Sequence, residues 1–319
     1  MKHKIFIDGA AGTTGLKIRE LLLRRDEIEL IELADDKRKD PAAKAQAFGQ
    51  AEVAILCLDD ANAVQSVALA QDSEVRIIDA STAHRVHPDW VYGLAELGPD
   101  QRGKIKEAKY VSNPGCYPTG ALLALKPLIA KGLLTPEILL NIFAISGYSG
   151  GGRKLIEAYE ANSVATKSRA DWAARPYALG LQHKHTPEIQ VHSGLNTKPI
   201  FCPVVGDFAQ GMIVQIPLFS SQIQSSGDAI GEIFQIWQDY YGDENFVSIA
   251  KLSPDEATEA GFLSAVNLVG TNQVELMAFG HSDQCMLVAR LDNLGKGASG
   301  ACVQNLNLML GLEEATSLV

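Results

Sequence analysis

The 319-residue sequence has no long apolar run, few cysteines and a deficit of positive charge. No stretch is apolar for long enough to span a bilayer, and no signal peptide precedes the first apolar segment. We therefore expect a cytoplasmic protein without a membrane partner. The 28 lysines and arginines against 38 acidic residues give a net charge of −10, which argues against non-specific binding to nucleic acid. Repeats and low-complexity tracts are also lacking.

The five cysteines are an odd number without regular spacing, which excludes a disulfide framework and a cysteine metal cluster. Cys57 and Cys285 lie in apolar, strand-like segments, and Cys302 lies in a predicted C-terminal helix. All three are expected to pack in cores. The sequence leaves the role of Cys202 open. We expect no bound metal.

The chain opens with a pattern that is typical of a nucleotide site. An apolar strand over Lys4–Ile7 is followed by a glycine turn and by a predicted helix over Leu16–Arg25. In this context glycines let the backbone approach a pyrophosphate at the helix N-terminus. The spacing is G-x-x-G-x-x-G, so a plain strand–helix turn is the alternative. We expect the dinucleotide to contact Gly9, Gly12, Thr13, Thr14 and Gly15.

The alternation of predicted strands and helices continues through the first third of the chain. Strands are predicted over Ile28–Leu33, Glu52–Leu58 and Val75–Asp79, with a helix over Ala61–Ala70, which indicates a parallel sheet. Asp79 leads to Ser81 at the carboxyl edge of the sheet, where ligands bind in such folds.

The second strand ends in a charged turn that bears on the choice of cofactor. Asp35 and Asp36 suit the ribose hydroxyl of NAD, whereas Lys37, Arg38 and Lys39 suit the extra phosphate of NADP. The three cations favour NADP, with Arg38 as the candidate contact. A solvated charged turn is the alternative.

One cysteine stands on a Pro/Gly turn just before a helical run. Cys116 follows Pro114-Gly115, and the helix is predicted over Ala121–Lys131, with Pro118 at its first position. A helix N-terminus favours negative charge and so stabilises a thiolate, which is the nucleophilic form. The alternative is an inert buried cysteine.

The second half contains another glycine-rich turn and a histidine pair. A strand over Ile138–Ile145 leads into Ser146–Arg153 and a helix over Lys154–Ala161, so the turn can form a second cradle of backbone N–H groups; a flexible loop is the alternative. In an extended segment His183 and His185 would point the same way, with Glu188 as an orienting partner. Metal binding would need further ligands, and a surface polar turn is also open.

The remaining pattern predicts a second domain. Strands are expected over Ile213–Leu218, around Val266 and Leu268, around Val274 and Leu276, and over Met286–Ala289. A glycine-rich segment over Leu291–Gly300 then leads into a helix over Ala301–Leu310. We expect a dinucleotide-binding domain of residues 1–116 and 291–319, and a substrate and oligomerisation domain of residues 117–290.

These motifs resemble those of the N-acetyl-γ-glutamyl-phosphate reductase family, in particular its shorter type 2 branch. The resemblance covers essentially the whole chain and is carried by segments 9–15, 79–85, 112–119, 146–153, 183–188 and 293–300. It implies an α/β fold with a Rossmann-type NADP domain and an α+β domain with a mixed sheet. The final helix would return to the first domain.

The resemblance also implies a reaction. NADPH would reduce N-acetyl-γ-glutamyl phosphate to an aldehyde through a thioester, as a step of arginine biosynthesis. Cys116 would be the nucleophile, His185 the acid/base and Glu188 its orienting partner, in a homodimer or tetramer. The expected substrate contacts are Arg85, Asn113, Ser146, Gly147, Arg153 and His183, with Gly297 against the cofactor. Backbone N–H groups at the helix start or in the Gly147–Gly152 loop would hold the oxyanion.

Three other functions stay open at this point. A sister reductase for aspartyl or amino-adipyl phosphate would use the same cysteine–histidine chemistry. A non-catalytic NADP-sensing regulator would keep the nucleotide domain without Cys116 and His185 acting. A cysteine hydrolase is the third, and the nucleotide half argues against it.

Overall fold

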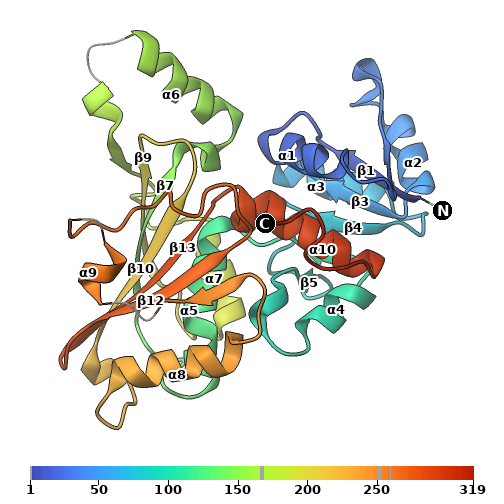
Figure 1. The fold of residues 1–319 in the computed structure, drawn as a ribbon. Helices are drawn as coiled ribbons and strands as arrows, with labels where there is room; N and C mark the ends of the chain where they lie inside the picture. Colours follow the sequence, from blue (N-terminus) through green and yellow to red (C-terminus); the bar gives the residue numbers. More distant parts are fainter. Residues whose placement is uncertain (1, 166–168, 251–252, 259) are drawn as a thin grey trace. The chain divides into compact units, whose positions relative to one another are not determined.

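The computed structural model describes residues 2–165, 169–250, 253–258 and 260–319. The chain separates into two compact units, each formed by its own sheet and helices (Figure 1). The first comprises Met1–Gly115 and Ala298–Val319, and the second comprises Cys116–Gly297. The chain returns to the first unit at residue 298, after the predicted 291, because the turn before residue 298 hydrogen-bonds within the second unit.

A parallel six-stranded sheet forms the first unit, which confirms the predicted Rossmann-type fold. Its strands run in the order β2-β1-β3-β4-β6-β5, and every pairing is parallel. The chain moves from β1 to β2 on one side and to β3 on the other, so a topological switch point lies at the carboxyl end of β1. The strands are β1 (His3–Asp8), β2 (Ile28–Ile31), β3 (Val53–Leu56), β4 (Arg76–Asp79), β5 (Val91–Tyr92) and β6 (Tyr110–Ser112).

Helices cover both faces of this sheet. Alternate residues of β1 explain the two layers, because Ile5 and Ile7 pack with Ile18 of α1, whereas Phe6 packs on the other face with Phe48 of α2. The helices and 3₁₀ turns are α1 (Thr13–Leu22), η1 (Asp35–Lys37), α2 (Pro41–Gln50), α3 (Asp60–Leu69), η2 (Ala95–Leu97), α4 (Gln101–Glu107) and α10 (Gly300–Leu310). Helix α1 begins three residues before the predicted Leu16.

The C-terminal helix α10 belongs to the first unit, as predicted. Its buried amides bond to distant parts of that unit: Asn307 accepts from Arg25 at 2.6 Å, and Asn305 donates to the Gly93 carbonyl at 2.8 Å. Cys302 packs in the same core, as the sequence indicated.

The second unit is built on a mixed seven-stranded sheet, which confirms the predicted α+β class. The order is β11-β12-β13-β10-β7-β9-β8, with parallel pairs at β7/β9 and β11/β12 and antiparallel pairs elsewhere. The strands are β7 (Asn141–Gly147), β8 (Ala174–Pro176), β9 (Ile200–Gly206), β10 (Met212–Phe219), β11 (Val247–Ile249), β12 (Val274–Gly280) and β13 (Gln284–Leu291). The strand predicted around Val266 and Leu268 was wrong: these carbonyls accept from Val269 and Thr271 in successive turns.

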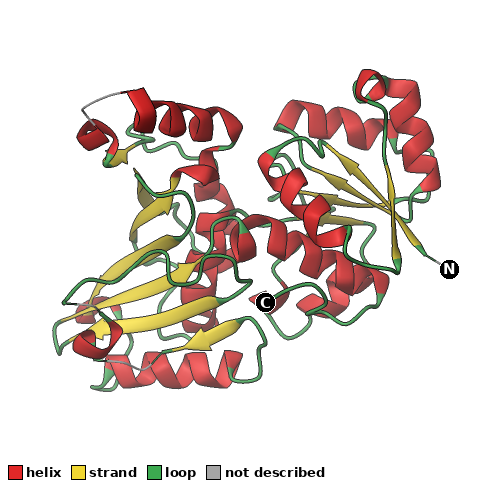
Figure 2. Ribbon diagram, turned by 45° about the horizontal axis from the view of Figure 1, so that its top comes forward, coloured by secondary structure: helices red, strands yellow, loops and turns green. Residues whose placement is uncertain are grey.

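Helices α5, α7 and α8 form the layer beside this sheet (Figure 2). Helix α5 contacts β10, β12 and β13, and both α7 and α8 pack on α5. The helices and short turns are α5 (Cys116–Ala130), η3 (Tyr148–Gly151), α6 (Arg153–Ala165), η4 (Arg169–Trp172), α7 (His185–Ser193), η5 (Ser220–Gln222), α8 (Ala229–Tyr241), α9 (Pro254–Ala257) and the π-helical turn η6 (Gly295–Ser299). Within the described ranges, no helix combines the length and apolarity needed to cross a membrane.

Candidate functional site

Cys116 is the first residue of helix α5 and is partly accessible to solvent. The helix begins five residues earlier than the predicted Ala121. Pro118 lies in the first turn, where N–H groups have no partner within the helix, so its missing donor does not stop the helix from reaching Cys116. The thiol therefore lies at a helix N-terminus, as the argument for a stabilised thiolate requires.

The histidine pair does not lie in an extended segment, contrary to the prediction. Lys184 has helical backbone angles, and His185 is the first residue of α7. The backbone N–H of His185 donates to Nδ1 of His183 at 3.1 Å. Glu188 lies one turn further along α7, and both His185 and Glu188 are buried.

The bond to Nδ1 fixes the state of His183. Its Nδ1 lone pair is used by the His185 N–H, so the neutral ring carries its proton on Nε2. Burial, helped by the nearby Lys184 ammonium, lowers the pKa of His183 to about 4. At neutral pH, His183 is therefore an uncharged hydrogen-bond donor rather than an imidazolium.

Two tyrosines complete this cluster, and the sequence analysis missed both. Tyr177 donates its phenol proton to the Tyr117 oxygen at 3.1 Å. Burial raises the pKa of Tyr117 above its usual range and that of Tyr177 to about 12, and the charge of a nearby Cys116 thiolate adds to both increases. Both phenols are therefore neutral beside the cysteine, and Tyr177 uses its proton in the bond to Tyr117. Tyr117 adjoins Cys116 in the sequence, whereas no local pattern marks Tyr177.

Tyr117 brings the cysteine and the histidines into one site. Its ring centroid lies 5.8 Å from that of His185 and 6.0 Å from that of His183, and the two histidine rings are 4.7 Å apart. Ser146, buried at the end of β7, hydrogen-bonds to the Tyr117 side chain. The second unit thus gathers Cys116, Ser146, His183 and His185, which the sequence placed far apart.

The glycine-rich loop after β7 is less open than predicted. The N–H groups of Gly147, Tyr148 and Ser149 donate to the carbonyls of Gly211, Phe208 and Ala209, and the Gly152 N–H donates to Ser149. Four N–H groups of the proposed cradle are therefore used within the fold. The loop therefore offers fewer backbone donors to an oxyanion than its sequence suggested.

The buried amide of Asn293 explains how the loop is held. Its Oδ1 accepts from the Gly211 N–H at 2.8 Å, and its Nδ2 donates to Ser149 Oγ at 3.0 Å. Arg153, at the start of α6, is exposed and pairs with Glu157 at 2.7 Å.

In the first unit, the glycine turn packs so closely against neighbouring backbone that side chains at Gly9 and Gly15 would collide with it. Gly9 has a φ of +90°, and a Cβ there would collide with the Cys57 carbonyl; a Cβ on Gly15 would lie 2.5 Å from the Gly9 oxygen. The Gly12 N–H donates to Gly9, and Thr13 and Thr14 open helix α1. This turn lies at the switch point of the sheet, where a dinucleotide pyrophosphate binds in such folds.

The other predicted contacts of the first unit lie along the carboxyl edge or near it. Ser81 donates its hydroxyl proton to Asp79 at 2.7 Å, and His84 bonds to the same carboxylate oxygen at 2.6 Å. Buried Arg85 donates to the Ala80 carbonyl at 3.0 Å. Arg38 follows η1, is exposed and pairs with Asp35 at 2.7 Å.

Asn113 is buried, and its amide bonds within the first unit. Its Nδ2 donates to the Ala298 carbonyl at 3.0 Å, and its Oδ1 accepts from Asn305 at 3.1 Å. Both amide atoms thus tie the chain just after β6 to the turn before α10 and to the middle of α10.

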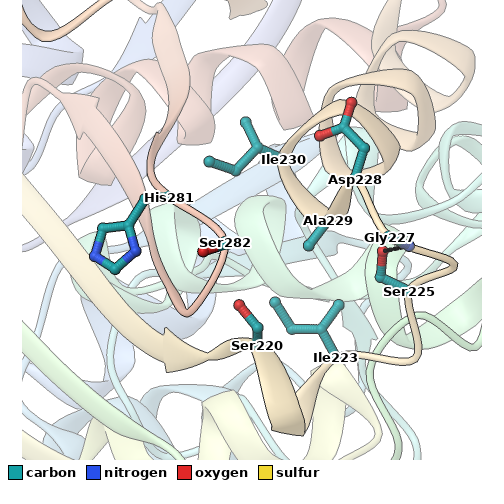
Figure 3. Close-up of a pocket in the computed structure, with 9 residues that line it drawn as sticks. All are labelled: Ser220, Ile223, Ser225, Gly227, Asp228, Ala229, Ile230, His281 and Ser282. Atoms are coloured by element: carbon teal, nitrogen blue, oxygen red, sulfur yellow. Dashed lines mark hydrogen bonds between the residues drawn. The ribbon is translucent and has the colours of Figure 1, made fainter.

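A separate hollow of about 500 Å³ opens between η5, the start of α8 and the β12–β13 hairpin (Figure 3). Its lining includes Ser220, Ile223, Ile230 and Ser282 and none of the predicted site residues. Among the described residues, no group of three His, Cys, Asp or Glu side chains is placed to hold a metal ion.

Each of the two units matches a known protein family. Residues 4–105 match the family described as semialdehyde dehydrogenase, NAD binding domain, and residues 116–293 match semialdehyde dehydrogenase, dimerisation domain. The N-acetyl-gamma-glutamyl-phosphate reductase 2 of Nostoc sp. is 49% identical over 323 residues, which cover 99% of each chain. The N-acetyl-gamma-glutamyl-phosphate reductase of Brucella ovis is 46% identical over 98% of this chain and 100% of that protein.

Solved structures share the fold at low identity. Aspartate semialdehyde dehydrogenase II of Vibrio cholerae, complexed with ASA, aligns with a TM-score of 0.71 at 15% identity over 98% of this chain and 99% of that one. The Candida albicans aspartate semialdehyde dehydrogenase with NADP aligns with a TM-score of 0.66 at 15% identity, over 97% of this chain and 99% of that one. Given the near-complete match to the curated relatives, the chain belongs to the N-acetyl-gamma-glutamyl-phosphate reductase family.

Proposed function

We propose that this chain catalyses the NADPH-dependent reduction of N-acetyl-γ-glutamyl phosphate to N-acetylglutamate 5-semialdehyde and phosphate. One observation carries the proposal: Cys116, at the first position of α5, lies in a cluster with Tyr117, His183 and His185, in a chain of this family. A nucleophile at a helix N-terminus beside a histidine is the arrangement that acyl transfer through a thioester requires.

The first half of the reaction uses the thiolate. Cys116 Sγ attacks the γ-carbonyl carbon, a carbon–sulfur bond forms, the carbon–oxygen bond to phosphate breaks, and phosphate leaves with its electron pair. When bound, the reduced nicotinamide supplies the hydride that turns the thioester carbonyl into a thiohemiacetal. The thiohemiacetal hydroxyl then returns its proton to His185, the carbon–sulfur bond breaks, the aldehyde leaves, and the electron pair stays on Cys116 Sγ.

We assign proton transfer to His185 rather than His183. His183 is neutral and uses Nδ1 to accept from the His185 backbone, so it offers only an Nε2–H donor. His185 provides the acid that protonates the developing oxyanion. Glu188, buried one turn along α7, is the proposed orienting partner of His185.

Substrate contacts follow from this cluster. His183, through Nε2–H, and the Tyr117 phenol are proposed to donate to the acyl phosphate, and Ser146 stays a predicted contact of the substrate. Arg85, Arg153, Asn113 and Gly147 stay predicted contacts of the substrate.

The glycine turn suits a dinucleotide, because Gly9 and Gly15 let the turn and the start of α1 pack closely on the chain's own backbone at the switch point, where a pyrophosphate binds in such folds. Gly12, Thr13 and Thr14 would hold the pyrophosphate at the start of α1, and Ser81 would lie against the cofactor. We propose NADP rather than NAD, with Arg38 meeting the 2′-phosphate after releasing Asp35.

We further propose a cytoplasmic homodimer or tetramer assembled through the second unit. The strand register places Phe143, Ile200 and Phe219 on one face of the sheet, and each is about half exposed. An apolar face of this kind is typical of a subunit interface.

The reverse reaction tests the substrate assignment. Purified protein with NADP, phosphate and N-acetylglutamate 5-semialdehyde is expected to generate NADPH absorbance, and Cys116→Ala is expected to lower the rate at least about 10³-fold. Aspartate semialdehyde and amino-adipate semialdehyde serve as comparison substrates. Preference for either would assign the chain to a sister acyl phosphate. A folded, NADP-binding protein that turns over none of them would favour the sensor.

A further inference from the structure

We infer that Gly297 is a positioning residue for the Cys116 side chain, and that it acts through direct contact with the cysteine rather than with the cofactor. The inference rests on the proposed function only in taking Cys116 as the nucleophile. A Cβ built on Gly297 would lie 2.7 Å from Cys116 Cβ and 3.2 Å from Cys116 Cα. The glycine therefore lies directly against the residue that carries the thiol.

The turn that carries Gly297 is π-helical, which is uncommon and often occurs at functional sites. The Gly297 N–H donates to the Asp292 carbonyl, five residues earlier, at 2.9 Å. That carbonyl oxygen would lie 3.0 Å from a Cβ on Gly297. A side chain at 297 would thus be caught between Cys116 and backbone, so the cysteine would have to move.

Hydrogen bonds and burial around the turn limit how far it can move. Asp292 accepts from the N–H groups of Leu294 and Gly270, at 2.9 and 2.8 Å. Lys296 is fully buried, with its ammonium 5.3 Å from the centre of the Phe246 ring. These contacts anchor the part of the turn that immediately precedes Gly297.

The consequence for chemistry follows from the size of the shift. The gap between Gly297 and Cys116 would have to open from 2.7 Å towards the 3.4 Å of ordinary contact, which is a shift of several tenths of an ångström. Misplacement of a reacting group by about 1 Å costs about 10²-fold in rate. Movement away from the start of α5 would also weaken stabilisation of the thiolate.

The test compares Gly297→Ala with the full-length wild-type chain by alkylation of Cys116. Iodoacetamide labelling is followed by mass spectrometry across pH, and it needs neither substrate nor cofactor. For Gly297→Ala we expect the pH of half-maximal labelling to rise and kcat to fall about 10²-fold, with KM for NADPH within about 3-fold of wild type. An unchanged labelling profile with a raised KM for NADPH would overturn the inference and return Gly297 to the cofactor site.

Gly295→Ala is the matched control in the same turn. Its Cβ would meet the Thr271 carbonyl and Asp292 rather than Cys116, so it strains the turn without pressing on the cysteine. We expect both variants to unfold at lower urea concentration but only Gly297→Ala to shift the labelling profile. An equal shift in Gly295→Ala would mean that general loosening of the turn is the cause, which contradicts direct positioning. Failure of the reductase assay alone, with the labelling result intact, would count against the proposed function and not against this inference.

Discussion

The two histidines of the site lie two residues apart but play different parts in the hydrogen bond between them. His183 accepts a backbone hydrogen bond on Nδ1, and its pKa is lowered to about 4 by burial. His185 contributes that backbone N–H and begins α7. The backbone that begins α7 thus holds His183 as a neutral donor beside the proposed acid, His185.

We expect His185→Asn to lower kcat about 10²- to 10⁴-fold, the usual contribution of general acid–base catalysis. His183→Asn keeps a neutral N–H donor and should act mainly on KM. Steady-state kinetics of both variants in the forward direction measure the difference. A larger loss of kcat in His183→Asn than in His185→Asn would reverse the assignment.

The lowered pKa of His183 also predicts how stability depends on pH. Between its ordinary pKa near 6.5 and its folded value of about 4, the unfolded chain binds a proton at His183 that the native state does not. The contribution of neutral His183 to the free energy of unfolding is therefore fully present above pH 6.5, and it is lost as the pH falls towards 4. Urea unfolding at pH 7 and pH 4.5 measures it.

His183→Asn should flatten part of that pH dependence. His87→Asn, which changes a half-exposed histidine of the other unit, is measured in parallel to separate the effect of residue 183 from that of removing any histidine. Equal slopes for wild type and His183→Asn would show that His183 is not protonated differently in the two states.

At the scale of elements, helix α5 contains an internal proline, and a neighbouring helix supplies the hydrogen bond that this proline cannot make. Pro127 has no N–H, so the carbonyl of Leu123 lacks the donor that the helix would normally supply. The Tyr241 hydroxyl of α8 donates to this carbonyl at 3.0 Å. Trp237, also on α8, donates to the next carbonyl, that of Ala124, at 3.1 Å. Helix α8 thus supplies the hydrogen-bond donor that helix α5, which begins with Cys116, lacks.

We expect Tyr241→Phe to lower the free energy of unfolding by about 1–3 kcal/mol, because a buried carbonyl loses its partner. In a Pro127→Ala background the helix regains its own donor, and the cost should shrink by about 1 kcal/mol. Urea unfolding of the four proteins measures the coupling.

Trp237→Phe provides the matched control for this cycle. The Ala124 carbonyl keeps its helical donor whether residue 127 is proline or alanine, so Trp237→Phe should not couple to Pro127→Ala. Equal coupling for both α8 substitutions would argue against the proposed role of Tyr241.

The elements that the sequence predicted well are long and strongly apolar or lie around glycine turns. Strands β1, β3, β4, β10 and β13 and helix α10 fall where hydrophobic runs predicted them. Strands β5 and β6 are two and three residues long and carry no periodicity. Val266 and Leu268 alternate as a strand would, yet their backbone forms turns, so tertiary context decides there.

The residues of the site divide in the same way, into those that a local sequence pattern marks and those that only long-range contacts bring in. Cys116 and the histidine pair were marked by their neighbours in the sequence, but their convergence depends on the packing of α5 against α7. Tyr177 and Asn293 act through contacts with residues 60 and 144 positions away, for which one sequence holds no signal. The glycine loop after β7 looked like an open cradle because its hydrogen bonds to residues 208–211 are long-range.

At the scale of the whole molecule, the chain pairs a nucleotide-binding unit with a unit that holds the proposed nucleophile. The family match covers both, over residues 4–105 and 116–293. The first segment of the first unit ends at Gly115 and the second unit begins at Cys116, so the proposed nucleophile stands at the junction in the sequence. Covalent attachment to Cys116 is the step on which the proposed mechanism depends.

A burst experiment without phosphate tests that step most directly. With NADP and N-acetylglutamate 5-semialdehyde but no phosphate, the aldehyde can be oxidised to the Cys116 thioester and then lacks its acceptor. We predict a burst of about one NADPH per active site, an N-acetylglutamyl group on the Cys116 peptide by mass spectrometry, and turnover that resumes when phosphate is added. Steady NADPH formation without phosphate, or with no acyl group on Cys116, would contradict the thioester mechanism.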